Sequence, residues 1–243
     1  MSHLDSLLFL SAAAFAGALV SGLAGFAFSA VAGAILLHVL PPSEAVPLMM
    51  ASSIAVQGGN LWALRKNIQW RDSAVLIGGG LLGVPLSVYL LHNVDTMLFR
   101  AGFGITVALY SAYMLFRPSL ASSHAMASSG RNALIGFGGG LIGGLTAMPG
   151  ALPTIWCDLH GLPKAQQRGV VQPFIAAMQL FALTLMLSQR TLSSTVLINL
   201  AISLPALLAG TALGIFMFRA VNEALFRRII LVILFLSGLG LIV

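Results

Sequence analysis

Polar side chains and glycines recur at matched positions in the two halves of this 243-residue chain, and both can bind an anion without a positively charged side chain. Gln57 and Gln179 lie in the middle of apolar stretches, and their amide groups can donate hydrogen bonds to oxyanions. Glycine-rich segments at 21–26 and 143–150 would let a ligand approach backbone N–H groups closely. A helix that starts at such a segment points its free N–H groups and the positive end of its dipole at the ligand. The pattern predicts anion binding by neutral donors.

The other candidate residues lie in or beside these segments. Ser53 shares one helical face with Gln57. Gln172 precedes Gln179 by two helical turns and therefore lies on its face. No catalytic residue, metal ligand or cofactor is expected. The predicted substrate-binding residues are Ser21, Gly22, Ala24, Gly25, Ser53, Gln57, Gly144, Thr146, Gly150, Gln172 and Gln179.

A structural role is the alternative for each of these residues. Small residues let membrane helices pack closely, and glutamines bond neighbouring helices with about 0.6 kcal/mol on average. Arg168, predicted at the cytoplasmic mouth, either collects anions or anchors a span. His38 and His160 each precede a Leu-Pro pair and are expected to cap helix C-termini.

The chain is a tandem duplication of a unit of about half its length. His38 opens the sequence HVLP, and His160 opens HGLP 122 residues later. At the same offset Gln57 aligns with Gln179, and after a five-residue insertion Gly83 aligns with Gly210. In a membrane protein such a duplication is typical of a transporter whose site lies between the repeats. The predicted organisation is a repeat at 1–120, a cytoplasmic linker at 121–132 and a second, inverted repeat at 133–243.

Composition excludes a soluble protein. Hydrophobic residues make up 58% of the chain and charged residues only 7%, whereas soluble domains carry about 25% charged residues. The net charge of +6 does not indicate nucleic-acid binding, because the basic residues lie in short loops rather than on one face. One cysteine, Cys157, excludes an intrachain disulfide. No signal peptide is expected, since the first basic residue is Arg65.

Six apolar runs are long enough to cross a bilayer, which takes about 20 helical residues. The predicted spans are 45–65, 73–92, 97–116, 169–188, 195–218 and 227–243. Two further apolar segments, 6–38 and 133–159, are interrupted by glycines or prolines that break helices. In lipid, irregular backbone survives only where protein or a water-filled cavity surrounds it. We therefore expect two re-entrant hairpins, each made of two short half-helices, with tips near 21–26 and 143–150.

The predicted fold is an all-α polytopic membrane protein, in which a re-entrant helical hairpin plus three transmembrane helices occurs twice as an inverted repeat. Each half crosses the membrane an odd number of times, so the second half is inverted. The positive-inside rule supports this arrangement. With residues 65–71 in the cytoplasm, only Arg100 and Arg190 remain outside, and both termini are periplasmic. The cytoplasmic basic residues are then Arg65, Lys66, Arg71, Arg117, Arg131, Lys164, Arg168, Arg219, Arg227 and Arg228.

These features resemble the TauE/SafE family of sulfite and sulfonate exporters over essentially the whole chain. The second half carries the resemblance best, in 149–153 (PGALP), 161–164 (GLPK) and 167–174 (QRGVVQPF). The resemblance implies a bacterial inner-membrane permease for sulfite, sulfonates, thiosulfate or other small organic anions. Family members often carry small hydroxyl residues after the second hairpin, where this chain has Gln172, Pro173 and Phe174. The choice of anion within the family is therefore open.

The expected mechanism is alternating access, with the anion held between the two hairpin tips and the two glutamines. The expected partners are a small anion and the lipid bilayer, without nucleic acid; a homodimer is compatible with the sequence. An anion channel and an ion-coupled importer are the alternatives within transport, and a scaffold protein is another. An intramembrane serine protease is disfavoured, because the five histidines are expected in loops and away from the buried serines.

Overall fold

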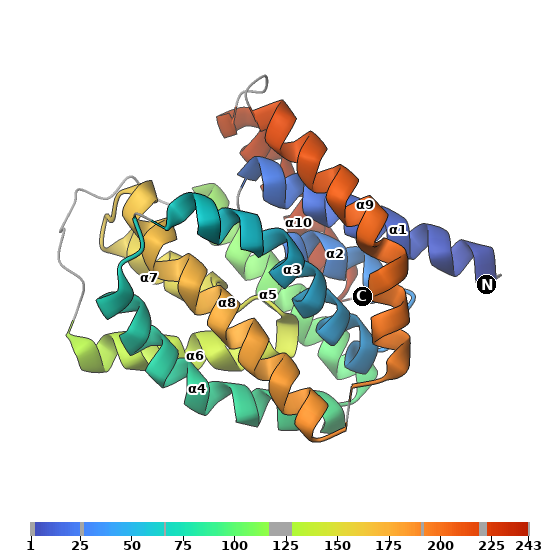
Figure 1. Cartoon of the computed structure of the whole chain (residues 1–243), viewed down its shortest axis with the longest axis horizontal. Helices are drawn as coiled ribbons and strands as arrows, with labels where there is room; N and C mark the ends of the chain where they lie inside the picture. The colour runs from blue at the N-terminus through green and yellow to red at the C-terminus, as the bar shows by residue number, and fades with distance from the viewer. Residues whose placement is uncertain are drawn as a thin grey trace. The chain divides into compact units, whose positions relative to one another are not determined.

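The computed structural model describes residues 3–24, 27–65, 67–116, 128–190, 192–218 and 223–242. Within these ranges the chain forms α-helices joined by turns and short connections, and it contains no β-strand. Figure 1 shows the arrangement of the elements. The helices are α1 (His3–Ala24), α2 (Phe28–Leu36), α3 (Pro42–Leu64), α4 (Trp70–Asn93), α5 (Thr96–Phe116), α6 (Ser129–Thr146), α7 (Ala151–Leu159), α8 (Lys164–Ser188), α9 (Ser194–Phe218) and α10 (Glu223–Gly240).

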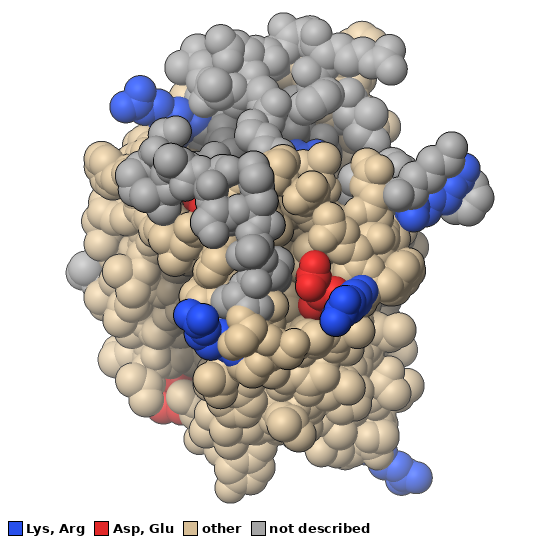
Figure 2. All heavy atoms as spheres, turned by 90° about the vertical axis from the view of Figure 1, so that its left-hand side faces the viewer, with Lys and Arg blue, Asp and Glu red and all other residues tan. Residues whose placement is uncertain are grey.

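Within the described residues, four segments are long and apolar enough to cross a membrane. They are Trp70–Asn93, Thr96–Phe116, Ala165–Ser188 and Ser194–Gly214. Large apolar side chains on these helices face outward, with Leu82, Leu109 and Leu208 each about two-thirds exposed or more. In the described part of the face shown in Figure 2, charged side chains form a few separate groups within a mostly uncharged surface. The chain is a multi-pass helical membrane protein. α3 and α10 form helices where spans were predicted, and their crossing of the membrane stays a prediction.

The helices group into two compact units, and each unit contains helices from both predicted repeats. One unit comprises residues 1–56, 94–117 and 192–243, which include α1, α2, α5, α9 and α10. The other comprises 57–93 and 118–191, which include α4, α6, α7 and α8. α3 contributes to both. The predicted repeat boundaries describe the duplication and not these units; residues 121–127 of the predicted linker lie outside the described part of the chain.

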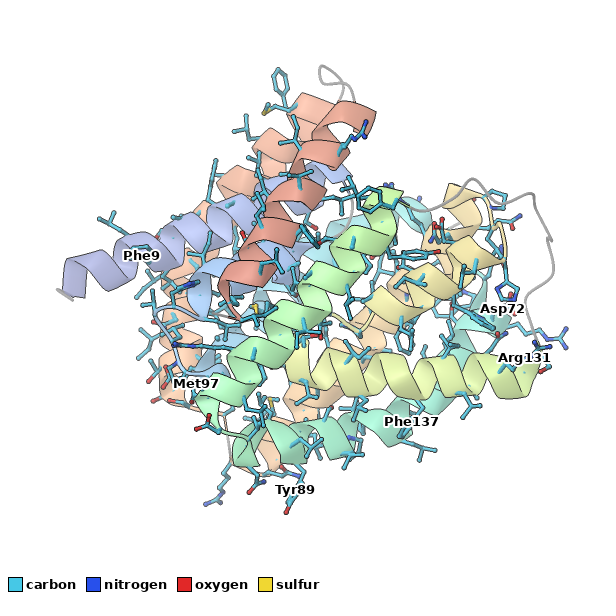
Figure 3. All side chains as sticks on the ribbon, turned by 180° about the vertical axis from the view of Figure 1, so that it is seen from behind. Phe9, Asp72, Tyr89, Met97, Arg131 and Phe137 are labelled. Atoms are coloured by element: carbon cyan, nitrogen blue, oxygen red, sulfur yellow. The ribbon has the colours of Figure 1, made fainter. Side chains whose placement is uncertain are left out.

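In the second unit, α4 and α6 pack side by side along glycine-lined faces and run in the same direction. Gly83 of α4 lies so close to α6 that a Cβ would collide with the backbone of Phe137 and Leu141. One turn away, a Cβ at Gly140 of α6 would collide with the backbone of Gly80 in α4. Figure 3 shows Asp72 and Arg131, near the starts of the two helices, at the same end of the pair and Tyr89 at the other end. Such close approach is typical of membrane helices joined through small residues.

The first unit repeats this contact with the counterpart residues. Gly210 of α9 lies against the backbone of Phe15 and Leu19 in α1. Gly210 is the counterpart of Gly83, and the two α1 residues are the counterparts of Phe137 and Leu141 at the 122-residue offset. The register deduced from the sequence therefore produces the same packing twice. In both cases a helix of one repeat packs against the hairpin of the other.

Both interrupted segments form helical hairpins, but their arms are unequal. The first arms, α1 and α6, have 22 and 18 residues, and the second arms, α2 and α7, have 9 each. The expectation of two short halves was therefore wrong for the first arms. In the second hairpin, Gly143 contacts Pro149, Gly138 contacts Leu152, and Asn132 accepts a hydrogen bond from Trp156. These contacts fit only antiparallel arms.

The second bend lies in the later part of the predicted tip at 143–150. Residues 21–24 belong to the last turn of α1, and 143–146 to the last turn of α6. Each hairpin has an alanine in the left-handed region between its arms, Ala27 (φ 71°) and Ala147 (φ 57°). The glycines did not end the helices, because in lipid a glycine keeps its helical hydrogen bonds and gains close packing.

The glycine contacts predict opposite effects of alanine at two positions of α4. Gly83→Ala is expected to destabilise the protein by about 1–3 kcal/mol, because the new methyl group would overlap backbone atoms of α6. Gly78→Ala, where a Cβ meets no atom within 4 Å, is expected to be neutral or stabilising. Thermal unfolding in detergent measures both. Equal melting temperatures for the two variants would contradict the α4–α6 contact.

Candidate functional site

The second bend is a break in helical structure that is buried on all sides. α6 ends at Thr146, Ala147 takes the left-handed conformation, and Gly150 precedes the first residue of α7. Ala147 is 1% exposed and Met148 8%, while Pro149 and Gly150 are also buried. The last carbonyls of one helix and the first amides of the next thus meet away from the surface, and both need partners.

Gln179 supplies a partner for the carbonyl end of the break. Its Nε2 donates a hydrogen bond to the carbonyl oxygen of Ala147 at 3.2 Å, and its side chain is 2% exposed. Gln179, which was predicted to contact the ligand, therefore has a structural role first: its hydrogen bond holds the bend. A side chain that fixes a bend also positions the amides that follow it, so the two roles are compatible.

The face of α8 that carries Gln179 covers the rest of the break. A Cβ at Gly150 would meet the side chains of Ile175 and Val171, so only glycine lets α7 start this close to α8. Gln172, which follows Val171 in α8, is also buried, at 6% exposed. The structure thus brings Gly150 and Gln179 together at one bend and packs the helix that carries Gln172 against it.

The amide end of the break points the start of α7 into this buried region. The first four N–H positions of a helix have no acceptor within the helix. In α7, Ala151 donates to the carbonyl of Met148 at 3.2 Å, and Pro153 has no N–H. Gly150 and Leu152 are then the two positions whose amides can face a ligand. The helix dipole adds partial positive charge at the same point, which favours an anion.

Two other predicted residues of this hairpin have structural contacts. A Cβ at Gly144 would overlap the side chain of Ser87, so this glycine allows α4 to pack against α6. The Thr146 hydroxyl donates to the carbonyl of Ile142 at 2.7 Å, one turn back in the same helix. Both residues lie before the bend, and the packing role considered for the glycines holds for Gly144.

The candidates from the first half are only partly described. Ser21 is 5% exposed at the end of α1; Gly22 and Ala24 lie in the same last turn, and Gly25 falls outside the described residues. Ser53 is 4% exposed in α3. Gln57 is 7% exposed, and its Oε1 is buried without a hydrogen-bond donor among the described residues. A buried amide oxygen without a donor is costly and therefore unusual.

A family comparison now adds to this geometry. The model of the family described as sulfite exporter TauE/SafE matches residues 9–241. The chain belongs to the sulfite exporter TauE/SafE family. No curated protein and no solved structure gave a significant match to the chain. The resemblance deduced from the sequence is confirmed over nearly the whole length, and the chain is a member of a family of membrane transporters.

In this TauE/SafE protein the predicted cap is found at one of the two histidines. His160 follows the last residue of α7, and its Nδ1 lies 2.9 Å from the carbonyl oxygen of Trp156. His38 is exposed in the turn after α2. The expectation that all histidines lie in loops was wrong for two of them. His3 is the first residue of α1, and His92 belongs to the last turn of α4 and bonds the Val88 carbonyl through Nδ1 at 2.9 Å.

Sequence reasoning missed the residues that join α7 to its neighbours. Trp156 Nε1 donates to Asn132 Oδ1 at 3.0 Å, and Gln167 Nε2 donates to the Thr154 carbonyl at 2.9 Å. The sequence showed that each of these positions is polar, but only the fold shows which of them bond to each other. Arg168, the predicted mouth residue, lies half-buried in the first turns of α8, one residue after Gln167.

The left-handed alanines predict a stabilising substitution in the first bend. Ala27→Gly is expected to raise stability by about 1 kcal/mol, because an L-residue pays roughly that much in the left-handed region and glycine does not. Ala34→Gly is the control, since Ala34 is similarly half-buried but helical, and should lower stability by about 1 kcal/mol. Melting temperatures in detergent test the pair. A loss of stability in both variants would argue against a left-handed residue at 27.

Proposed function

We propose that this protein exports sulfite or a related small sulfur-containing or organic anion across the bacterial inner membrane by alternating access. The observation that carries the proposal is the buried start of α7, which packs through Gly150 against α8, the helix that carries Gln172 and Gln179. Family membership supports transport of a sulfur oxyanion. The bend adds a chemical reason, because bare amides and carboxamides bind oxyanions without a buried cation.

The parallel packing of α4 and α8 supports inversion of the two repeats. Ser73 Oγ donates to the Val170 carbonyl at 2.9 Å, and further along both helices Gly80 packs against Met178. α8 is the counterpart of α3, which precedes α4 and must cross the membrane in the opposite direction if both are spans. Repeats of equal orientation would therefore make α8 antiparallel to α4. The observed direction favours inverted repeats.

The pair α5 and α10 gives a second, independent argument. They are counterparts, so inverted repeats require them to run antiparallel, whereas repeats of equal orientation would make them parallel. Gly104 of α5 contacts Ile242, just after α10, and Ala108 contacts Gly238 within α10. Four residues forward along α5 thus correspond to four residues back along the partner segment, as antiparallel packing requires.

The positions of basic residues support the proposed orientation. In the second unit, Arg71, Arg131 and Arg168 stand in the first turns of α4, α6 and α8. Since these helices run in the same direction, all three cations gather at one end of the unit. Asn67 contacts Gly169 at that end, which adds Arg65 to the group. The positive-inside rule assigns this end to the cytoplasm.

Export of an anion needs no coupling ion. A monoanion leaving the cell gains roughly 2.3 kcal/mol per 100 mV of inside-negative potential, and a dianion about twice that. In liposomes loaded with sulfite, an inside-negative potential is therefore expected to accelerate efflux, measured against a zero-potential control. Efflux that ignores the imposed potential would reject electrogenic uniport. Saturation and counterflow are expected of a transporter, and unsaturated current would instead indicate a channel.

Two glutamines of α8 offer a matched test of the site. Gln179→Ala removes the bond that holds the Ala147 carbonyl and is expected to weaken sulfite binding at least tenfold, because the amides after the bend lose their position. Gln167→Ala removes a similar glutamine–carbonyl bond between α8 and α7 but away from the bend, and should change affinity less than twofold. Calorimetry on purified protein measures both. Parental affinity in Gln179→Ala would place the anion elsewhere.

A further inference from the structure

The chain passes between its two compact units at four places, and one of them differs from the rest. The crossings at 93/94, 117/118 and 191/192 lie between helices. The crossing at 56/57 lies inside α3, whose helix continues to Leu64. A helix shared by two compact units has to bend if the units change their relation to each other.

A glycine pair follows this crossing directly. Gly58 is exposed, and a Cβ there would meet no atom within 4 Å. Packing therefore does not require glycine at 58, in contrast to Gly83 or Gly136, where a Cβ would collide with backbone. Glycine in a helix interior weakens the helix relative to alanine. Gly58 thus carries a cost that close packing does not explain.

The second repeat lacks both features. At the 122-residue offset, Gly58 and Gly59 correspond to Leu180 and Phe181 of α8. α8 lies entirely within one compact unit, whereas α3 is divided between two. The glycine pair and the division of the helix therefore occur together in one repeat and are both missing from the other.

We propose that α3 is a hinge that bends at Gly58 and Gly59 and that this bend accompanies the exchange between the inward-open and outward-open states. Sharp helix kinks arise at prolines or at pairs of small residues such as these. Pro47, the proline inside α3, lies within a single unit and away from the crossing. Gln57 directly precedes the hinge, so bending would reorient its buried carboxamide. This inference rests on the proposed transport function.

The transport test compares alanine at three helical glycines. Gly58→Ala stiffens the proposed hinge, while Gly78→Ala in α4 and Gly102→Ala in α5 are controls with equally open surroundings. For Gly58→Ala we expect the maximal rate of sulfite efflux from liposomes to fall at least tenfold, with a sulfite Kd within twofold of the parent. Both controls should keep rate and Kd within twofold. A parental rate in Gly58→Ala, or an equal loss in the controls, would overturn the hinge.

Hydrogen–deuterium exchange separates failure of the hinge from failure of the proposed function. A bending α3 breaks the hydrogen bonds that span Gly58, so Gly58→Ala should slow exchange at residues 58–62 well beyond the roughly fivefold effect of helix propensity. Gly78→Ala gives that baseline in α4. Strongly slowed exchange at residues 58–62, with no sulfite flux in the parent or in any variant, would support the hinge and reject sulfite as the substrate. A slowing no greater than at Gly78 would reject the hinge whether or not sulfite moves.

Discussion

A helix broken inside an apolar bundle must find partners for its own backbone, and this requirement organises the second half of the molecule. The break between α6 and α7 leaves carbonyls on one side and amides on the other. Gln179 bonds the Ala147 carbonyl, and Pro153 removes one of the amides. On the amide side, Gly150 and Leu152 keep N–H groups that can face a ligand. These donors match the negative charge of the proposed substrate.

Close helix packing holds this break in place. α4 approaches α6 through glycines at which a methyl group would not fit, and Ser73 ties α4 to α8. Phe174 and Met178 of α8 lie against Gly80 of α4. α4 thus contacts both the hairpin and the helix that carries Gln172 and Gln179. The frame around the break therefore includes one helix of the other repeat.

The sequence predicted the broad plan because that plan follows from strong and local physical constraints. Charge-free runs of about 20 residues have few alternatives to a spanning helix, so the helices fall near the expected spans. The alignment of Gly83 with Gly210 also predicted equivalent positions, and both glycines make the same contact. The duplication could be read because packing faces tolerate little change in register.

The exact residues of the bends and the partners of individual polar groups could not be predicted from the sequence. Glycine is compatible with a break and with close packing, and only the neighbour decides; at Gly144 that neighbour is Ser87. The partner of Gln179 lies 32 residues away at a backbone carbonyl, which has no sequence identity to recognise. The positions of Gly25 and of the first tip's amides stay predictions. Local propensity fixes elements, whereas the site depends on contacts between distant segments.

Each compact unit combines helices from both repeats, and this has a consequence for the origin and synthesis of the protein. α1 packs on α9, and α4 packs on α6, so each hairpin receives its main neighbour from the opposite half of the gene. A single half would leave a glycine-lined face bare. A half-length chain could cover that face by pairing with a second copy, and the duplication supplies this copy within one chain. During translation, α1 can gain its neighbour α9 only after most of the second half has been synthesised.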